Sequence, residues 1–219
     1  MTTQEYGRRE EKMITIAVPG EVWALEGLFV GGEGDAPAGA VIAPPHPLYG
    51  GSMDSPVVTE LGWALSRTGH ATVRFNWRGV GASGGEASGE PADAEADYAA
   101  ALACLEETAP GPLVAAGYSF GAVAAIRVAA RSPRVGRLLL VAPPPALLDA
   151  GALEGFAGRA LAIVGDADAF APLPELGARF ADPERRTLEV IPGADHFFMA
   201  GLADVSRLAR EWLEAGSWP

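Results

Sequence analysis

Short runs of apolar residues alternate along most of the chain with longer segments in which apolar residues recur every three or four positions. Short unbroken apolar runs are typical of strands buried in a parallel sheet, and the longer spacing is typical of helices that cover such a sheet. The pattern predicts about eight strands, at residues 13–18, 21–30, 38–43, 71–76, 113–118, 137–142, 160–165 and 187–191.

The first two predicted strands are separated only by Pro19 and Gly20, a strong turn signal, so we expect them to form an antiparallel hairpin. The later strands alternate with helical segments, one of which places Val57 and Leu61 on a single face. No linker, repeat or low-complexity tract interrupts this alternation. The sequence therefore predicts one α/β domain over residues 1–219, built on a doubly wound, mostly parallel sheet.

The charge balance is strongly acidic, with 16 Lys and Arg against 28 Asp and Glu and a formal net charge of −12. Nucleic acids and anionic membranes are bound chiefly through Lys and Arg near phosphate, so the balance argues against both as partners. It favours the approach of neutral or cationic substrates over anions. Cys104 is the only cysteine, which excludes an internal disulfide and Cys-rich zinc modules.

Two further features bear on the location of the protein. Residues 1–13 carry several charged side chains and lack the apolar core of an export signal. The longest apolar stretch, residues 138–148, is interrupted by prolines and falls well short of the roughly 20 residues needed to span a bilayer. We therefore expect a soluble cytoplasmic protein, whose oligomeric state the sequence leaves open.

The pattern G-x-S-x-G occurs twice, around Ser83 and around Ser119. In hydrolases this pattern forms a sharp strand-to-helix turn, which exposes the serine Oγ and directs the following backbone N–H groups toward the reacting carbonyl. Ser119 follows the predicted strand 113–118 and precedes an Ala-rich helical segment, whereas Ser83 has neither neighbour. We therefore predict that Ser119 is a nucleophile.

Residues 79–84 also match the dinucleotide-binding fingerprint G-x-G-x-x-G. That fingerprint should open a helix, so that the pyrophosphate meets the helix N-terminus. Here Gly85, Ser88, Gly89 and Pro91 prolong a loop instead, which argues against a nicotinamide or flavin enzyme.

A serine nucleophile needs an adjacent base, most often a histidine that a carboxylate orients. In sheet enzymes of this kind the chain order is serine, acid, histidine, and His196 is the only histidine that follows Ser119. The acid should end the strand between them, where both Asp166 and Asp168 are available. Periodicity alone does not separate these two aspartates.

The motifs together resemble the α/β-hydrolase superfamily, and most closely its small, cap-less serine hydrolases of esterase and dienelactone-hydrolase type. The resemblance covers nearly the whole chain and is carried by residues 44–51, 76–83, 117–121, 165–168 and 195–196. It implies the α/β-hydrolase fold and a catalytic triad, with no metal and no organic cofactor.

The resemblance also bears on individual residues. In the family the acid usually falls three residues after the glycine that ends its strand, which selects Asp168 over Asp166. Many relatives have His-Gly in the loop that supplies the second oxyanion donor, but here Pro47 has no N–H to donate. The backbone N–H groups of Leu48 and Phe120 are then the expected oxyanion hole.

Larger relatives insert a cap domain after the strand predicted at 137–142. Here only residues 143–159 intervene before the next strand, too few for a helical cap. We therefore expect no cap domain and an open, shallow site, edged by apolar residues that contact substrate: Leu48, Tyr49, Met53, Phe170 and Phe197.

The function predicted from these features is hydrolysis of small carboxylic esters through an acyl-enzyme on Ser119, with His196 as base and Asp168 orienting it. A thioesterase or a peptidase with the same triad is a near alternative. A ligand-binding or signalling protein that keeps this scaffold without turnover is an alternative of another class, because one fold hosts many functions.

Overall fold

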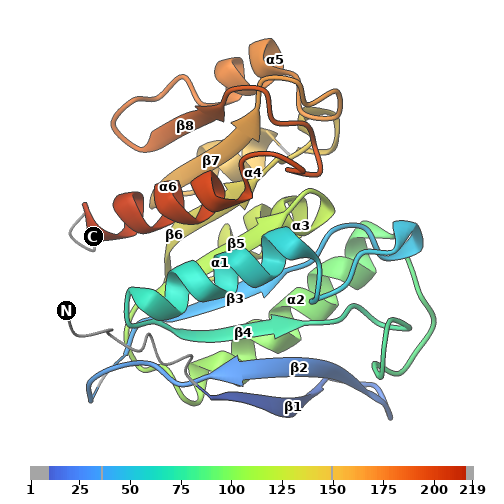
Figure 1. Cartoon of the computed structure of the whole chain (residues 1–219). Coiled ribbons are helices and arrows are strands. Elements are labelled where there is room, and N and C mark those ends of the chain that lie inside the picture. Colours follow the sequence, from blue (N-terminus) through green and yellow to red (C-terminus); the bar gives the residue numbers. More distant parts are fainter. Residues whose placement is uncertain (1–9, 36, 149, 216–219) are drawn as a thin grey trace, which may run out of the picture.

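The structure is a computed structural model, which describes residues 10–35, 37–148 and 150–215 (Figure 1). The predictions made for residues 1–9, the expected lack of an export signal and the start of the domain, lie outside the described residues. Eight strands form one sheet: β1 (Glu11–Ala17), β2 (Ala24–Val30), β3 (Gly39–Ala43), β4 (Ala71–Phe75), β5 (Leu113–Tyr118), β6 (Val135–Val141), β7 (Arg159–Gly165) and β8 (Arg186–Ile191).

All eight predicted strands are present, and β2 begins three residues later than expected because residues 18–21 form a turn, in which the N–H of Glu21 donates to the carbonyl of Val18. The strand order is β1-β2-β4-β3-β5-β6-β7-β8. The pairs β1–β2 and β2–β4 are antiparallel, and every other pair is parallel. The predicted mostly parallel sheet with an antiparallel N-terminal hairpin is therefore confirmed.

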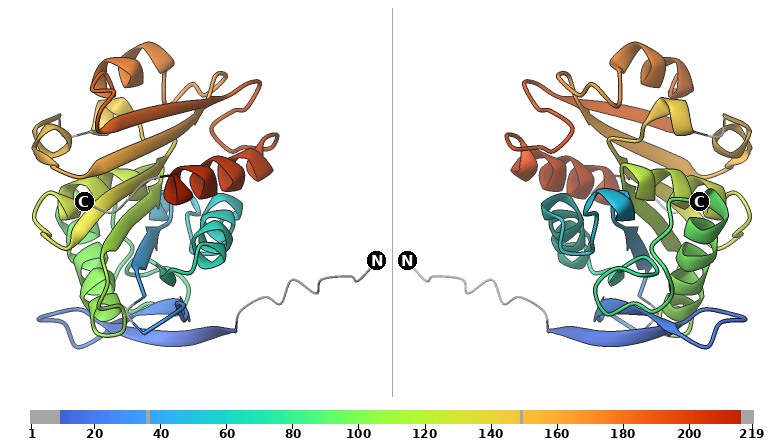
Figure 2. Two further views of the ribbon diagram at one scale, coloured as in Figure 1. Left: turned by 90° about the vertical axis from the view of Figure 1, so that its left-hand side faces the viewer. Right: turned by 90° about the vertical axis from the view of Figure 1, so that its right-hand side faces the viewer.

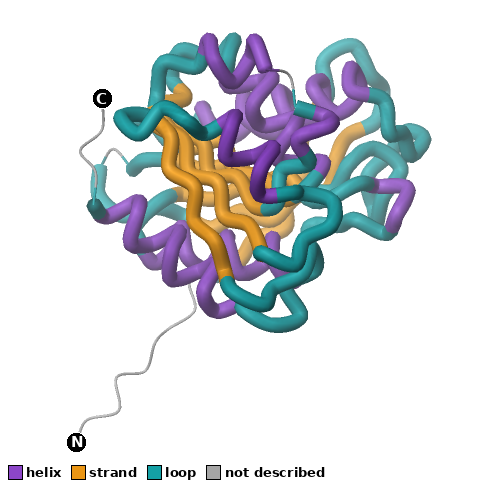
Figure 3. The backbone as a smooth tube through the Cα atoms, turned by 90° about the horizontal axis from the view of Figure 1, so that it is seen from above, coloured by secondary structure: helices purple, strands orange, loops and turns teal. Residues whose placement is uncertain are grey.

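Helices cover both faces of this sheet, which lies between them (Figure 3). On one face α1 (Pro56–Arg67) and α6 (Leu202–Glu214) pack together. The other face carries α2 (Pro91–Glu106), α3 (Phe120–Ala129), α4 (Ala150–Gly155) and α5 (Leu173–Arg179). Figure 2 shows the two helix layers on opposite sides of the sheet. Each layer buries its own apolar cluster against the strands, which gives the doubly wound arrangement two cores.

In its described residues, the connection between β6 and β7 contains only a 3₁₀ turn, η2 (Pro145–Leu147), and the short helix α4. A cap domain inserted at this point would need several more helices. Over the described residues, no inserted domain therefore covers the carboxyl ends of the parallel strands, where sheets of this class bind ligands. In the described parts of the chain no helix combines the length and apolar character needed to cross a membrane.

Candidate active site

Ser119 stands between the end of β5 and the start of α3, with backbone angles φ 54° and ψ −117°. Few non-glycine residues occupy this region, because the Cβ atom is crowded by the backbone. The conformation is held from both sides: the N–H of Ser119 donates to the carbonyl of Val141 at 2.8 Å, and its own carbonyl accepts from Ala122 at 3.0 Å. The predicted sharp turn is present, and it places the Ser119 side chain at the carboxyl edge of the sheet.

Two glycines make this tight bend possible. A Cβ atom added at Gly117 would lie 2.3 Å from the carbonyl group of Gly121, and one added at Gly121 would lie 2.4 Å from the carbonyl oxygen of Ala43. Both distances are far shorter than a van der Waals contact, and the obstructing atoms are backbone. The glycine pattern in the sequence therefore reflects the close approach of α3 to β5 and β3.

We expect Gly117→Ala to lower the free energy of unfolding by about 2–4 kcal/mol, because the backbone of the bend must shift to admit a methyl group. Urea denaturation measures this change. The control is Gly177→Ala in α5, where an added Cβ meets nothing within 4 Å and alanine raises helix propensity, so stability should stay equal or rise by up to about 1 kcal/mol. Equal stability of Gly117→Ala and the wild type would contradict this account of the bend.

Ser119, His196 and Asp168 are joined in series by hydrogen bonds. The Oγ of Ser119 lies 3.0 Å from Nε2 of His196, and Nδ1 of His196 lies 2.8 Å from Oδ2 of Asp168. All three residues are buried, with Ser119 at 9% exposure. A carboxylate only accepts hydrogen bonds, so Nδ1 carries the imidazole proton and Nε2 has its lone pair toward the serine.

The structure distinguishes between the two aspartates that the strand pattern left open. Oδ1 of Asp168 accepts the N–H groups of Phe170 and Ala171 at 2.8 and 2.9 Å, which fixes the carboxylate while Oδ2 faces His196. Asp166 instead accepts the N–H of Gly193 at 2.6 Å and braces the turn that follows β8. Asp168, the residue that the resemblance selected, is therefore the one next to the imidazole.

Tyr118 is a residue of this site that the sequence analysis treated only as part of a strand. Its hydroxyl donates to the backbone carbonyl of His196 at 2.8 Å, and the two rings are 5.6 Å apart. Burial, helped by the negative charges of Asp168 and Asp195, raises the pKa of Tyr118, which keeps the hydroxyl protonated as a donor. Tyr118 thus ties the loop that carries the histidine to the strand that carries the serine.

The loop expected to supply the second oxyanion donor forms a short 3₁₀ turn, η1 (Pro47–Tyr49), directly after His46. The N–H of Leu48 donates to Nδ1 of His46 at 3.2 Å, so it is not the free donor that the resemblance implied. Burial lowers the pKa of His46, which favours the neutral imidazole that this bond requires. The His46 ring also lies 4.6 Å from that of Phe120, and this contact packs the loop against the first residue of α3.

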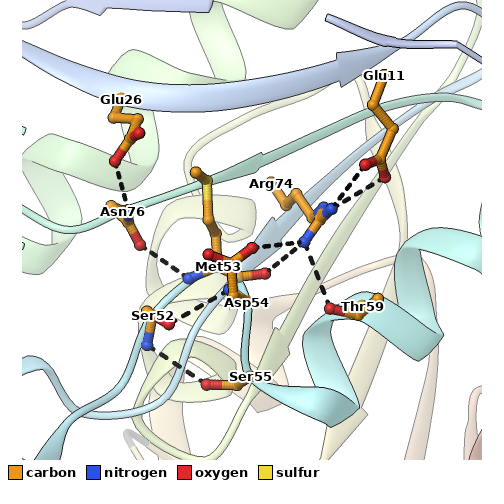
Figure 4. Close-up of polar contacts among 9 residues, drawn as sticks. All are labelled: Glu11, Glu26, Ser52, Met53, Asp54, Ser55, Thr59, Arg74 and Asn76. Atoms are coloured by element: carbon orange, nitrogen blue, oxygen red, sulfur yellow. Dashed lines mark hydrogen bonds and ion pairs between the residues drawn. The ribbon is translucent and has the colours of Figure 1, made fainter. Parts of the chain in front are cut away.

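The same loop is anchored further along by hydrogen bonds to strand β4, which Figure 4 shows in close-up. The N–H of Met53 donates to Oδ1 of Asn76 at 2.8 Å, and its carbonyl accepts from Arg74 at 2.8 Å. Glu26 and Glu11 in turn hold the side chains of Asn76 and Arg74. Met53 is only 4% exposed, so the expectation that it edges the site is wrong: its side chain is buried and its backbone anchors the loop.

The other four residues expected at the edge of the site, Leu48, Tyr49, Phe170 and Phe197, are exposed. The rings of Phe170 and Phe197 lie 4.8 and 5.6 Å from that of His196, and Tyr49 lies beside His46. Exposed aromatic side chains therefore lie beside His196 on one side and beside His46 on the other.

The segment that matches the dinucleotide fingerprint is a loop between β4 and α2, and α2 begins only at Pro91. The Oγ of Ser83 is buried, donating to the carbonyl of Asn76 and accepting the N–H of Glu26, both at 2.9 Å. Among the described residues, the hydrogen bonds of Ser83 are to backbone groups and none is to a histidine, so Ser83 has a structural role. Among the described residues, no group of His, Cys, Asp and Glu side chains is placed to hold a metal ion.

A doubly wound sheet with a serine on a strained strand-to-helix bend and a histidine against its Oγ defines an α/β serine hydrolase. Comparison with known proteins agrees with this class. The family described as serine aminopeptidase, S33, matches residues 48–169, more than half of the 219-residue chain. The chain therefore belongs to this family and, with it, to the α/β-hydrolase superfamily.

Solved structures and curated proteins show the same relationship. An α/β serine hydrolase homologue from Coxiella burnetii is 31% identical, with a TM-score of 0.80 over 95% of this chain and 99% of that one. An α/β serine hydrolase without lid from Xanthomonas campestris is 29% identical, with a TM-score of 0.80 over 97% and 99%. An uncharacterized protein of Rickettsia prowazekii is 30% identical over 80% of this chain and 77% of its own length. The predicted cap-less α/β-hydrolase fold is thus confirmed.

Proposed function

We propose that this hydrolase cleaves small carboxylic esters through an acyl-enzyme on Ser119. The observation that carries the proposal is the 3.0 Å separation between Ser119 Oγ and His196 Nε2, at a strained bend between β5 and α3. A serine hydroxyl is a weak nucleophile until a neighbouring base accepts its proton. The neutral imidazole, oriented by Asp168, is placed to be that base.

In the first half of the reaction Oγ bonds to the ester carbonyl carbon while its proton passes to Nε2 of His196. The carbonyl oxygen takes the displaced electron pair and becomes an oxyanion. The tetrahedral intermediate then collapses, the bond to the alcohol oxygen breaks, and that oxygen takes the proton from Nε2. In the second half water attacks the acyl-enzyme with His196 again as base, which releases the acid and restores Ser119.

The proposed oxyanion donors are the N–H groups of Phe120 and Leu48. Phe120 begins α3, where the first N–H groups have no acceptor within the helix and the positive end of the helix dipole favours an anion. The Leu48 N–H would give up its hydrogen bond to the neutral Nδ1 of His46 and donate to the oxyanion instead. That exchange is favourable, because a hydrogen bond to an ionised acceptor is roughly twice as strong as one between neutral groups. Each donor contributes roughly 3 kcal/mol to the transition state in comparable sites.

Esters are favoured over amides as substrates because an alcohol leaves more readily than an amine. The exposed rings of Phe170 and Phe197 beside His196 suit an uncharged alcohol group. Thioesters and peptides are the alternative substrates to be tested. Peptides are included also because the family is described as serine aminopeptidase. All three reactions would use the same three side chains, so the comparison of substrates decides among them.

The test is a panel of a p-nitrophenyl ester, a thioester and a p-nitroanilide of one acyl group, combined with fluorophosphonate labelling. We expect steady turnover, a kcat/KM for the ester at least about 10-fold above that for the anilide, and labelling of Ser119 alone. A faster anilide would make the protein a peptidase. Labelling of Ser119 without steady turnover of any substrate would contradict hydrolytic function and favour a ligand-binding protein on this scaffold.

A further inference from the structure

A cavity of about 430 Å³ opens beside the nucleophile bend, lined by Phe120 and not by His196. One wall is a stripe of α3 formed by Phe120, Val123, Ala124 and Arg127, which are spaced so that they share a helix face. Leu147 and Leu148 of the β6–β7 connection and the start of α2 form further walls. The cavity has the size of a small-ligand site.

The lining changes character along α3. Near Ser119 it is formed by the rings of Phe120 and His46, and beyond them by small aliphatic side chains. Arg127 stands two helical turns further on, roughly 10 Å along the helix axis from Phe120. His46 and Arg127 are the titratable side chains of this lining. Burial lowers the pKa of His46 and so favours its neutral form, which leaves the Arg127 guanidinium as the charged group.

Arg127 keeps both positive charge and an unused donor. Its Nη1 pairs with Oε1 of Glu95 at 3.3 Å, but Glu95 also binds Arg131 through Oε2, so two arginines share one carboxylate. Among the described residues, the buried Nε–H of Arg127 has no hydrogen-bond partner. Because two arginines share this one carboxylate, the Arg127 guanidinium keeps positive charge that a ligand anion in the cavity could pair with.

Other acids of α2 do not cancel this charge. Asp93 and Asp97 both bind Arg78, and the α2 residues that line the cavity are Pro91 and Ala94. The net charge of −12 slows the approach of anions over long distances, but that effect is screened by salt, whereas a pair formed inside the cavity is screened much less.

The position of the cavity decides which part of the substrate it would hold. His196 donates a proton to the leaving alcohol, so the alcohol lies on the histidine side, by Phe170 and Phe197. The acyl chain then extends the other way, past Phe120. We propose that this cavity is the acyl subsite and that Arg127 selects acyl chains ending in a carboxylate, as in half-esters of aliphatic dicarboxylic acids. This inference rests on the proposed function.

The test compares mono-p-nitrophenyl adipate with its neutral analogue, in which an isopropyl group replaces the free carboxylate. The variants are Arg127→Gln and the matched control Arg131→Gln, which loses a charge bound to the same Glu95 but is 65% exposed and does not line the cavity. We expect the wild type and Arg131→Gln to favour the adipate at least about 10-fold in kcat/KM. Arg127→Gln should lose that preference while its rate on the neutral ester changes less than about 2-fold.

Equal rates of the wild type on the two esters, or an equal loss on both esters in Arg127→Gln, would overturn the inference. Calorimetric titration with free adipate provides a second measurement that does not need turnover. Binding to the wild type that weakens at least about 10-fold in Arg127→Gln supports the subsite even if no ester is hydrolysed, in which case only the proposed function fails. Hydrolysis of the neutral ester without adipate binding leaves the proposed function intact and removes the subsite.

Discussion

Replacement of Ser119 with alanine is expected to lower kcat for p-nitrophenyl esters by about four orders of magnitude or more, because the only atom removed is the one that bonds to substrate. Alanine keeps the Cβ that the bend already accommodates, and the substitution removes one side-chain hydrogen bond, the one to His196. The free energy of unfolding should therefore change by no more than about 1 kcal/mol. Steady-state kinetics and urea denaturation of the same preparation measure the two effects.

Ser83→Ala is the matched control, since it removes the serine of the other G-x-S-x-G pattern. Ser83 Oγ links Asn76 and Glu26 in a buried position, so its loss should cost about 1–2 kcal/mol of stability. The folded fraction should keep kcat within a few-fold of the wild type. A Ser119→Ala variant with wild-type turnover would place the nucleophile elsewhere and remove the proposed mechanism.

Asp168→Asn should leave the fold intact and lower kcat by up to about four orders of magnitude. The amide can still accept the N–H groups of Phe170 and Ala171, but it offers a neutral partner, and through its NH₂ a donor, to Nδ1 of His196. An amide donor there favours the tautomer with the proton on Nε2, which cannot accept the proton of Ser119. The loss of the carboxylate also removes the charge that stabilises the imidazolium.

Asp166→Asn tests whether this effect belongs to Asp168 alone. The side-chain oxygen of asparagine can still accept the N–H of Gly193, so the turn after β8 should survive and kcat should stay within a few-fold of the wild type. The pH profile of kcat should change shape only in Asp168→Asn. If Asp166→Asn were the more damaging change, the acid would have been assigned to the wrong aspartate.

The strands and the helix faces could be predicted because each depends on residues close together in the chain. The nucleophile bend could be predicted because its residues 117–121 form a contiguous pattern, although Gly121 also needs room beside Ala43 of β3. A buried parallel strand needs an unbroken apolar run, and the bend at Ser119 needs small residues at 117 and 121, whose obstructing atoms lie in the bend itself or in the strand beside it. His196 could be chosen because chain order and strand ends are properties of the sequence.

Which side chains meet across the sheet was decided by the tertiary structure. Met53 is apolar and lies in a loop, so the sequence suggested an exposed edge. In the structure its side chain is buried, and its backbone is held by Asn76 and Arg74, more than 20 residues away. The choice between Asp166 and Asp168 depends on where the chain runs after β8, and the role of Arg127 depends on the packing of α2 against α3. Sequence patterns predict secondary structure and turns, because these depend on residues that are neighbours in the chain. The contacts named here join elements that are far apart in the chain and meet only when the whole sheet packs.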